Sequence, residues 1–284
     1  MEKLEERSAY SKKQKITRAY LSYWLNKFKC FIKKNIESLP VIGAFIVDIW
    51  KKTSSSIRLY RYSLERKHLR KKLENIQLTE EMVYKTYYVS PKDIIYSSLV
   101  EYSFNNGKGL ILDGNWDNLE KKFEDLDVYM AFKEVMLFNK KWQETVFYKR
   151  ILNRIQKGDI IWGCANKNDF DNRCEGFNQL INDIKNNGYR SQVELKSDDL
   201  NHEITINIGR YGDFLFSNGA HRLSIAKILG IEVIPVKVAV RHKEWMQFRS
   251  EFEKFAPVSD LKTYQPTLHP DLQYIQAHHS CEDS

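Results

Sequence analysis

The chain has 284 residues, of which 42% are hydrophobic and 13% aromatic, and its formal net charge is +8. These values support a real hydrophobic core and leave room for one large domain, or for one domain with extensions. The four cysteines contain no CxxC pair, so their spacing argues against a disulfide framework and against a zinc site. The N-terminus is charged and lacks the apolar run of a secretory signal, and we expect a reducing, cytoplasmic compartment.

The positive charge is concentrated at the start of the chain. Residues 1–75 hold 19 Lys and Arg against 7 Asp and Glu, a net charge of +12, so the remainder carries −4. A basic segment of this kind predicts an anionic partner, which is a lipid headgroup, a nucleic acid or an acidic protein face.

Residues 1–80 are predicted to form a basic helical extension. Apolar residues from Arg18 to Ile36 follow helical spacing with lysines off the stripe, which is typical of a basic amphipathic helix. The apolar run from Leu39 to Trp50 is too short to span a bilayer, which needs about 20 residues. Three interpretations stay open for residues 18–72: helices packed on the main domain, peripheral attachment to an anionic membrane at the inner face, and nucleic-acid binding.

Residues 81–245 are predicted to form one α+β domain, followed by a C-terminal tail over residues 246–284. Its first half contains a helix start at Ser90 and Pro91, a strand over Leu110–Leu112 and two helical patterns, FEDLDVYMAF and WQETVFYKRILNRIQKG, the second closed by Gly158.

The second half of this domain has the clearest patterns. The apolar residues Phe170, Cys174, Phe177, Ile181 and Ile184 predict an amphipathic helix, with Asn168 or Asp169 as N-cap and Gly188 as C-terminal stop. The stretch EITINI alternates as a strand does, and GRYGD predicts a hairpin turn to an antiparallel strand beginning at residue 214. A helix from about Gly219 to Leu229 and a closing strand, VIPVKVAV, follow.

The turn Ser217–Asn218–Gly219–Ala220–His221–Arg222 is the strongest candidate site. A helix N-terminus presents unpaired N–H groups and the positive end of a dipole, and Gly219 lets an anion approach closely. Arg222 offers a fork of donors suited to phosphate, and His221 can donate to phosphate or move a proton. Asn218 can cap the helix or help to hold a metal. The sequence therefore predicts an oxyanion site, with phosphate the best-fitting ion; the alternative is a capped helix whose Arg222 pairs with a surface carboxylate.

The segment SNGAHRLSIAKILGIEVIPVKV resembles the ParB/sulfiredoxin-like superfamily, which has a mixed sheet with flanking helices. The matching residues are Gly219, His221, Arg222, Ala226, Gly230 and Pro235. The upstream segment LINDIKNNGYRSQ is similar to another motif of that family, with Gly188 and Gln192 in place, and VSPKDI resembles its opening strand. Asn218 stands where the family has an acidic residue, and Ala220 where sulfiredoxins have their cysteine.

The resemblance implies a nucleotide, ATP, ADP or CTP, with its phosphates at residues 218–222 and with Arg190, Ser191 and Gln192 assisting. We expect a nucleotide-dependent phosphotransferase acting on a small-molecule, lipid-linked or glycan hydroxyl, with Mg²⁺ held by Asp113 and Asn218. Its predicted catalytic groups are Asp113, Glu124 and His221. Two alternatives remain: a ParB-like nucleic-acid-binding protein with nucleotide binding or hydrolysis, and a non-catalytic interaction protein.

Overall fold

The computed structural model describes residues 78–255, apart from 101, 103 and 198, together with residues 269–272. The predicted basic extension, with its membrane or nucleic-acid contacts, lies outside the described residues. The described residues belong to two compact units, one formed by residues 140–179 and the other by residues 78–139 and 180–272. The single domain that we expected over residues 81–245 stays a prediction.

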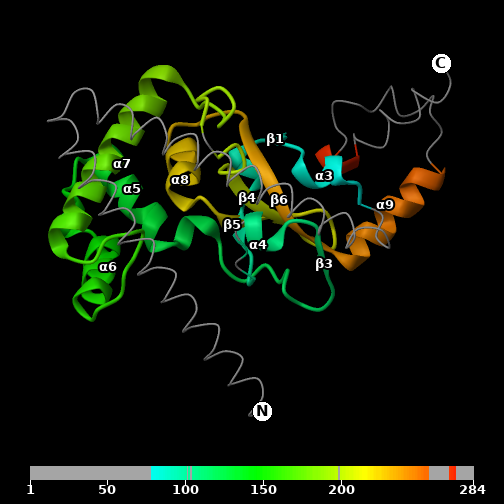
Figure 1. Cartoon of the computed structure of the whole chain (residues 1–284), viewed down its shortest axis with the longest axis horizontal. Coiled ribbons are helices and arrows are strands. Elements are labelled where there is room, and N and C mark those ends of the chain that lie inside the picture. Colours follow the sequence, from blue (N-terminus) through cyan, green and yellow to red (C-terminus); the bar gives the residue numbers. More distant parts are fainter. Residues whose placement is uncertain (1–77, 101, 103, 198, 256–268, 273–284) are drawn as a thin grey trace, which may run out of the picture. The chain divides into compact units, whose positions relative to one another are not determined.

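The larger unit is built on a six-stranded mixed sheet, so the protein is an α+β protein with flanking helices (Figure 1). Five strands run in the order β1 (Tyr87–Val89), β6 (Ile234–His242), β4 (Ile204–Ile208), β5 (Phe214–Asn218) and β2 (Tyr96–Ser97). The sixth, β3 (Leu110–Leu112), pairs with the second half of β6 in parallel. The nine residues of β6 are all buried, because other strands pair with both of its edges and helices pack against it.

The β4–β5 hairpin confirms the strand and turn that the sequence predicts. β5 runs antiparallel to β4, with Ile208 opposite Phe214. Ile204, Ile206 and Ile208 point into the main core, as the alternation indicates. The polar residues between them are buried as well, because the opposite face of the sheet is also covered. Asn207, on that second face, donates to Ser98 Oγ at 3.0 Å and to the carbonyl of Val100 at 3.2 Å.

Short helices cover both sides of this sheet. On one side, α8 (Ala220–Ile228) packs against α5 (Asp127–Phe138), and α8, α3 (Glu80–Tyr84) and α9 (Lys243–Phe255) all bury residues in the core that contains Ile204, Ile206 and Ile208 (Figure 1). α4 (Phe104–Gly107) packs against β6. Two 3₁₀ helices, Pro91–Asp93 and Phe123–Asp125, fall where the sequence predicts helix starts, and Ser90 caps the first with its side chain.

The segment predicted as a C-terminal tail contributes to the fold. α9 begins at Lys243, and residues 269–272 pack into the unit, with Asp271 fully buried. The Asp271 carboxylate accepts hydrogen bonds from Arg241 Nε at 2.9 Å, Arg241 Nη2 at 2.6 Å, Tyr87 Oη at 3.0 Å and Trp245 Nε1 at 3.0 Å. A buried carboxylate needs such partners, and here they fix the segment to β6, β1 and α9.

The smaller unit is helical. α6 (Val146–Gln156) is capped at its N-terminus by Thr145, whose hydroxyl accepts a hydrogen bond from the Tyr148 amide at 3.1 Å. The 3₁₀ helix Trp142–Glu144 precedes α6. α7 (Lys167–Asn187) begins one residue before the first predicted cap position, and its first turns bury Phe170, Cys174 and Phe177 as the apolar pattern predicts. Within the described residues, no helix combines the length and apolar content that crossing a membrane requires.

Candidate functional site

The predicted turn joins β5 to α8 through a glycine in the left-handed region. Gly219 has φ 93° and ψ 31°, and a Cβ at this position would lie 3.1 Å from Ile204 Cα. Only glycine fits both constraints. Because the N-cap residue has no side chain, it makes no capping hydrogen bond to the first turn of α8. The Oδ1 of Asn218 accepts from the Gly219 amide at 2.8 Å, so Asn218 shapes the turn.

Arg222 faces the chain segment that leads into β4. Its Nη2 donates to the carbonyl of His202, and its Nη1 lies 3.5 Å from Glu203 Oε2. The side chains of Arg222 and Glu203 are 14% and 1% exposed. This ion pair is longer than the 2.7–2.9 Å of a tight charge-assisted hydrogen bond. The carboxylate that pairs with Arg222 is therefore buried, whereas the alternative interpretation expected a surface one.

The loop after α7 meets the same carboxylate. The Gln192 amide donates to Glu203 Oε1 at 2.6 Å, and the Ser191 amide and hydroxyl both donate to Glu194 Oε2 at 2.7 Å. Glu203 thus links Gln192 to Arg222, and the structure brings these two predicted residues together. The amides of residues 191 and 192 are already occupied by carboxylates of the chain.

Arg190 belongs to a different contact. Its Nη2 donates to the Asp183 carboxylate at 2.8 Å and 3.0 Å, so the guanidinium is held on α7. His221 is half-buried, and its ring lies 5.7 Å from the ring of Phe132 on α5. The structure therefore places His221 at the start of α8, against α5.

Burial controls the electrostatics beside the turn. Burial raises the pKa of Glu203 above its usual range, although the Gln192 amide and the Arg222 charge oppose the shift. Burial also lowers the pKa of Lys237 to about 8, while the Glu203 charge opposes it. Lys237 lies on β6 opposite Thr205, and its Nζ donates to the carbonyl of Tyr84. Glu203 and Lys237 thus form a buried pair of unlike charges that interact within the sheet unit.

The two carboxylates predicted for catalysis lie elsewhere. Asp113 follows β3, which is parallel to β6 and to β4, whereas Gly219 follows β5, which is antiparallel to β4. Strand ends of opposite direction fall at opposite ends of a sheet, so Asp113 and Asn218 do not meet at one Mg²⁺. Asp113 is 63% exposed and accepts from Lys243 Nζ at 2.9 Å.

Glu124 also lies away from the turn. It pairs with Lys227 Nζ at 3.2 Å, in the last turn of α8. Lys227 lies seven residues after Ala220, which corresponds to roughly 10 Å along the helix axis. In the described part of the chain, no group of three His, Cys, Asp or Glu side chains could hold a metal ion.

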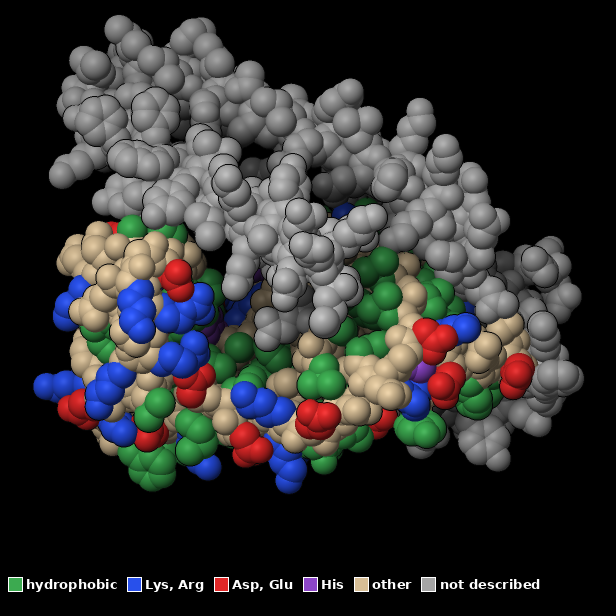
Figure 2. Space-filling view, turned by 90° about the horizontal axis from the view of Figure 1, so that it is seen from below, with side chains coloured by type: hydrophobic (Ala, Val, Ile, Leu, Met, Phe, Trp, Pro, Cys, Tyr) green, Lys and Arg blue, Asp and Glu red, His purple; other side chains and the backbone are tan. Residues whose placement is uncertain are grey.

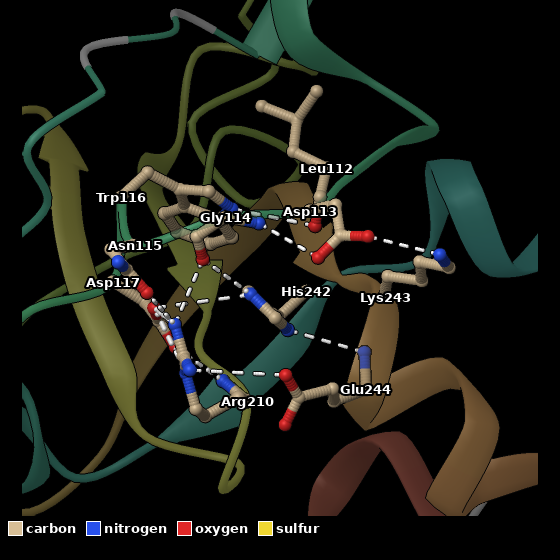
Figure 3. Close-up of polar contacts among 10 residues, drawn as sticks. All are labelled: Leu112, Asp113, Gly114, Asn115, Trp116, Asp117, Arg210, His242, Lys243 and Glu244. Atoms are coloured by element: carbon tan, nitrogen blue, oxygen red, sulfur yellow. Dashed lines mark hydrogen bonds and ion pairs between the residues drawn. The ribbon is translucent and has the colours of Figure 1, made fainter.

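A buried polar cluster occupies the opposite end of the sheet, beside Asp113 (Figure 3). Arg210, from the β4–β5 turn, donates to both oxygens of Asp117 at 2.8–3.2 Å and to the carbonyl of Gly114 at 2.8 Å. His242 Nε2 contacts the same carbonyl at 2.9 Å, and its Nδ1 accepts from the Glu244 amide. Burial opposes ionisation of Asp117, but Arg210 holds the pKa of this carboxyl below its usual range. These contacts tie the loop after β3 to β6 and to the hairpin.

Sequence reasoning missed Glu203 and Lys237. Glu203 opens the polar side of an alternating strand, which normally faces solvent, and Lys237 lies among the apolar residues of the closing strand. A lysine inside a run of Ile and Val residues was the available signal. Whether this lysine is buried depends on what covers the second face of the sheet, and the local sequence pattern does not contain that information.

Comparison with known proteins found no relative of this chain: no protein-family model, no curated protein and no solved structure matches it.

Proposed function

We propose that the chain binds a nucleoside polyphosphate at the first turn of α8 and transfers a phosphoryl group to a hydroxyl acceptor. The observation that carries this proposal is the β5–Gly219–α8 turn, where a glycine in the left-handed region enters a helix without a side-chain cap. The first-turn amides and the helix dipole together favour an anion at this position. The resemblance of residues 217–238 to the ParB/sulfiredoxin-like superfamily supports the same choice, and we assign the sheet unit to that fold.

Arg222 and Glu203 have linked roles in this proposal. A phosphate at the first turn of α8 competes with Glu203 for the Arg222 guanidinium, because both are anions and the present pair is 3.5 Å long. Exchange of one anion for the other leaves Glu203 beside the phosphate, where a carboxylate can orient an acceptor hydroxyl or hold Mg²⁺. Glu203 therefore takes the role that we expected for Asp113 or Glu124.

Isothermal titration with ATP, ADP and CTP, each with and without Mg²⁺, tests the binding step. We expect Arg222→Gln to weaken binding at least tenfold. Without Mg²⁺, Glu203→Gln should strengthen binding, because the amide no longer competes as a charge for Arg222. Lys185→Gln is the matched control, since it removes one positive charge from an exposed position on α7. The proposal fails if no nucleotide binds, or if Lys185→Gln weakens binding as much as Arg222→Gln does.

A further inference from the structure

The exposed face of α6 carries one stripe of basic side chains. The stripe consists of Lys149, Arg150, Arg154 and Lys157, which together with Val146 and Asn153 follow the three- and four-residue spacing of one helix face. Arg154 pairs with Asp159, but both side chains are about half exposed, so this ion pair contributes little to stability. Asp159 therefore competes only weakly with another anion for Arg154. Figure 2 shows many Lys and Arg side chains, with some Asp and Glu and hydrophobic side chains among them, on the part of the surface where α6 lies.

An exposed tryptophan lies at the tip of a tight turn in the same unit. Ile161 and Cys164 exchange two backbone hydrogen bonds, at 3.1 Å and 2.8 Å, around Trp162 and Gly163. Both turn residues have positive φ, 50° for Trp162 and 81° for Gly163, which defines a type I′ turn. Asn or Gly is the usual first residue of such a turn, and a bulky side chain there is an outlier. The indole nevertheless occupies this position, with 46% of its surface exposed.

A shared ring joins the tryptophan to the basic stripe. Trp162 stacks on the buried Phe147 with ring centroids 6.0 Å apart and an angle of 28°, and the Arg150 guanidinium lies 5.9 Å from the same Phe147 ring. One face of the indole therefore rests on Phe147, which Arg150 of α6 also contacts, and close to half of the residue is exposed. Rigid support of this kind reduces the entropy lost when a second flat group stacks on the indole.

We propose that Trp162 and the basic stripe of α6 form a binding surface for single-stranded nucleic acid. Single-stranded nucleic acid presents phosphates at short, regular spacing and unpaired bases, which match a row of cations and an exposed aromatic ring that are linked through Phe147. A membrane fits less well, because Val146 and Trp162 are the exposed large hydrophobic residues of residues 140–179 and an interfacial helix needs a broader apolar face. This proposal is independent of the α8 turn.

Fluorescence anisotropy with a labelled oligothymidylate of about 12 nucleotides tests the surface, because such sites span roughly 4–16 nucleotides. We expect Trp162→Asn to weaken binding about 5- to 150-fold, which is the usual effect of losing one stacked base. Asn suits a type I′ turn, so this variant should keep the melting temperature of the wild type or raise it. An oligouridylate of equal length separates the two sources of ligand: tighter binding of the uridylate would indicate RNA.

The charged residues have a separate readout. Each phosphate contact removed by Lys149→Gln or Arg150→Gln should lower the slope of log affinity against log salt concentration by about 0.7. Lys167→Gln is the control within the same unit, because Lys167 is paired with Asp171. The slopes are compared between variants because residues 1–75, with a net charge of +12, are present in all of them and add their own salt dependence. The proposal is overturned if Trp162→Asn binds as the wild type does, if Lys167→Gln lowers the slope equally, or if anionic vesicles bind through Trp162 and oligonucleotides do not.

Discussion

Substitution of Asp271 by Asn is the sharpest test of how the C-terminal segment contributes to the fold. The carboxylate is fully buried and accepts four hydrogen bonds, two of them from the equally buried Arg241. Replacing it with a neutral amide leaves the guanidinium without a compensating charge, which costs about 3–5 kcal/mol when one partner of a buried pair is removed. For a unit of this size the melting temperature should fall by about 6–20 °C.

Thermal and urea unfolding followed by circular dichroism measure this loss. Asp113→Asn is the matched control, because its carboxylate is exposed and paired only at the surface, and it should leave the melting temperature nearly unchanged. The double variant Arg241→Met with Asp271→Leu should recover much of the stability, since it removes both charges. A loss below about 1 kcal/mol for Asp271→Asn would refute the reasoning, because a docked and buried ion pair cannot lose one charge at so small a cost.

The same contact predicts a dependence on pH. Burial by itself would raise the pKa of Asp271, but the Arg241 charge and its hydrogen bonds hold this pKa well below its usual range. The folded state therefore binds the proton less readily than the unfolded state does. The stabilisation is fully present above the ordinary carboxyl pKa of about 4 and is lost as the pH falls below it. The unfolding free energy of Asp271→Asn should lack this acid-sensitive component.

Two further predictions concern the sheet around the candidate site. Gly219→Ala should lower the unfolding free energy by at least about 1–2 kcal/mol, because φ is positive and the new Cβ would lie 3.1 Å from Ile204 Cα. Gly230→Ala is the control and should cost less, because a Cβ there meets open space. Equal losses in chemical denaturation would contradict this reasoning. Burial lowers the pKa of Lys237 to about 8, so the unfolded state holds this proton more tightly and wild-type stability should rise between about pH 8 and pH 10. Lys237→Met should lack that rise in urea titrations, and an identical profile for the two proteins would rule the explanation out.

Several elements were predictable because their signals are local. The hairpin around residues 209–213, the helix after Gly219 and the closing strand occur close to the predicted positions. Each follows from side-chain periodicity of two or of about 3.6 residues, together with a glycine where the backbone turns. The same signals predicted the helices around residues 127–138 and 146–156. They did not reveal that residues 140–179 form a compact unit of their own.

The partners of charged side chains were less predictable. The sequence predicted that Arg222 binds phosphate, and the structure shows its guanidinium facing Glu203 and the carbonyl of His202. Asp113 follows a strand as a catalytic carboxylate can, but the strand directions place it at the end of the sheet opposite Gly219. Strand order and direction depend on pairings between distant parts of the chain, and the sequence pattern of one strand does not contain them.

The sequence by itself determined many of the local conformations, the asymmetric charge and the turn at Gly219, because these depend on neighbouring residues and on composition. Only the tertiary structure decided that the polar side of β4 is buried, that Glu203 links Gln192 to Arg222, and that Asp271 pairs with Arg241. The physical reason is that the environment of a charged group is set by what covers it. For Glu203 and Asp271 the cover comes from elements far away in the chain.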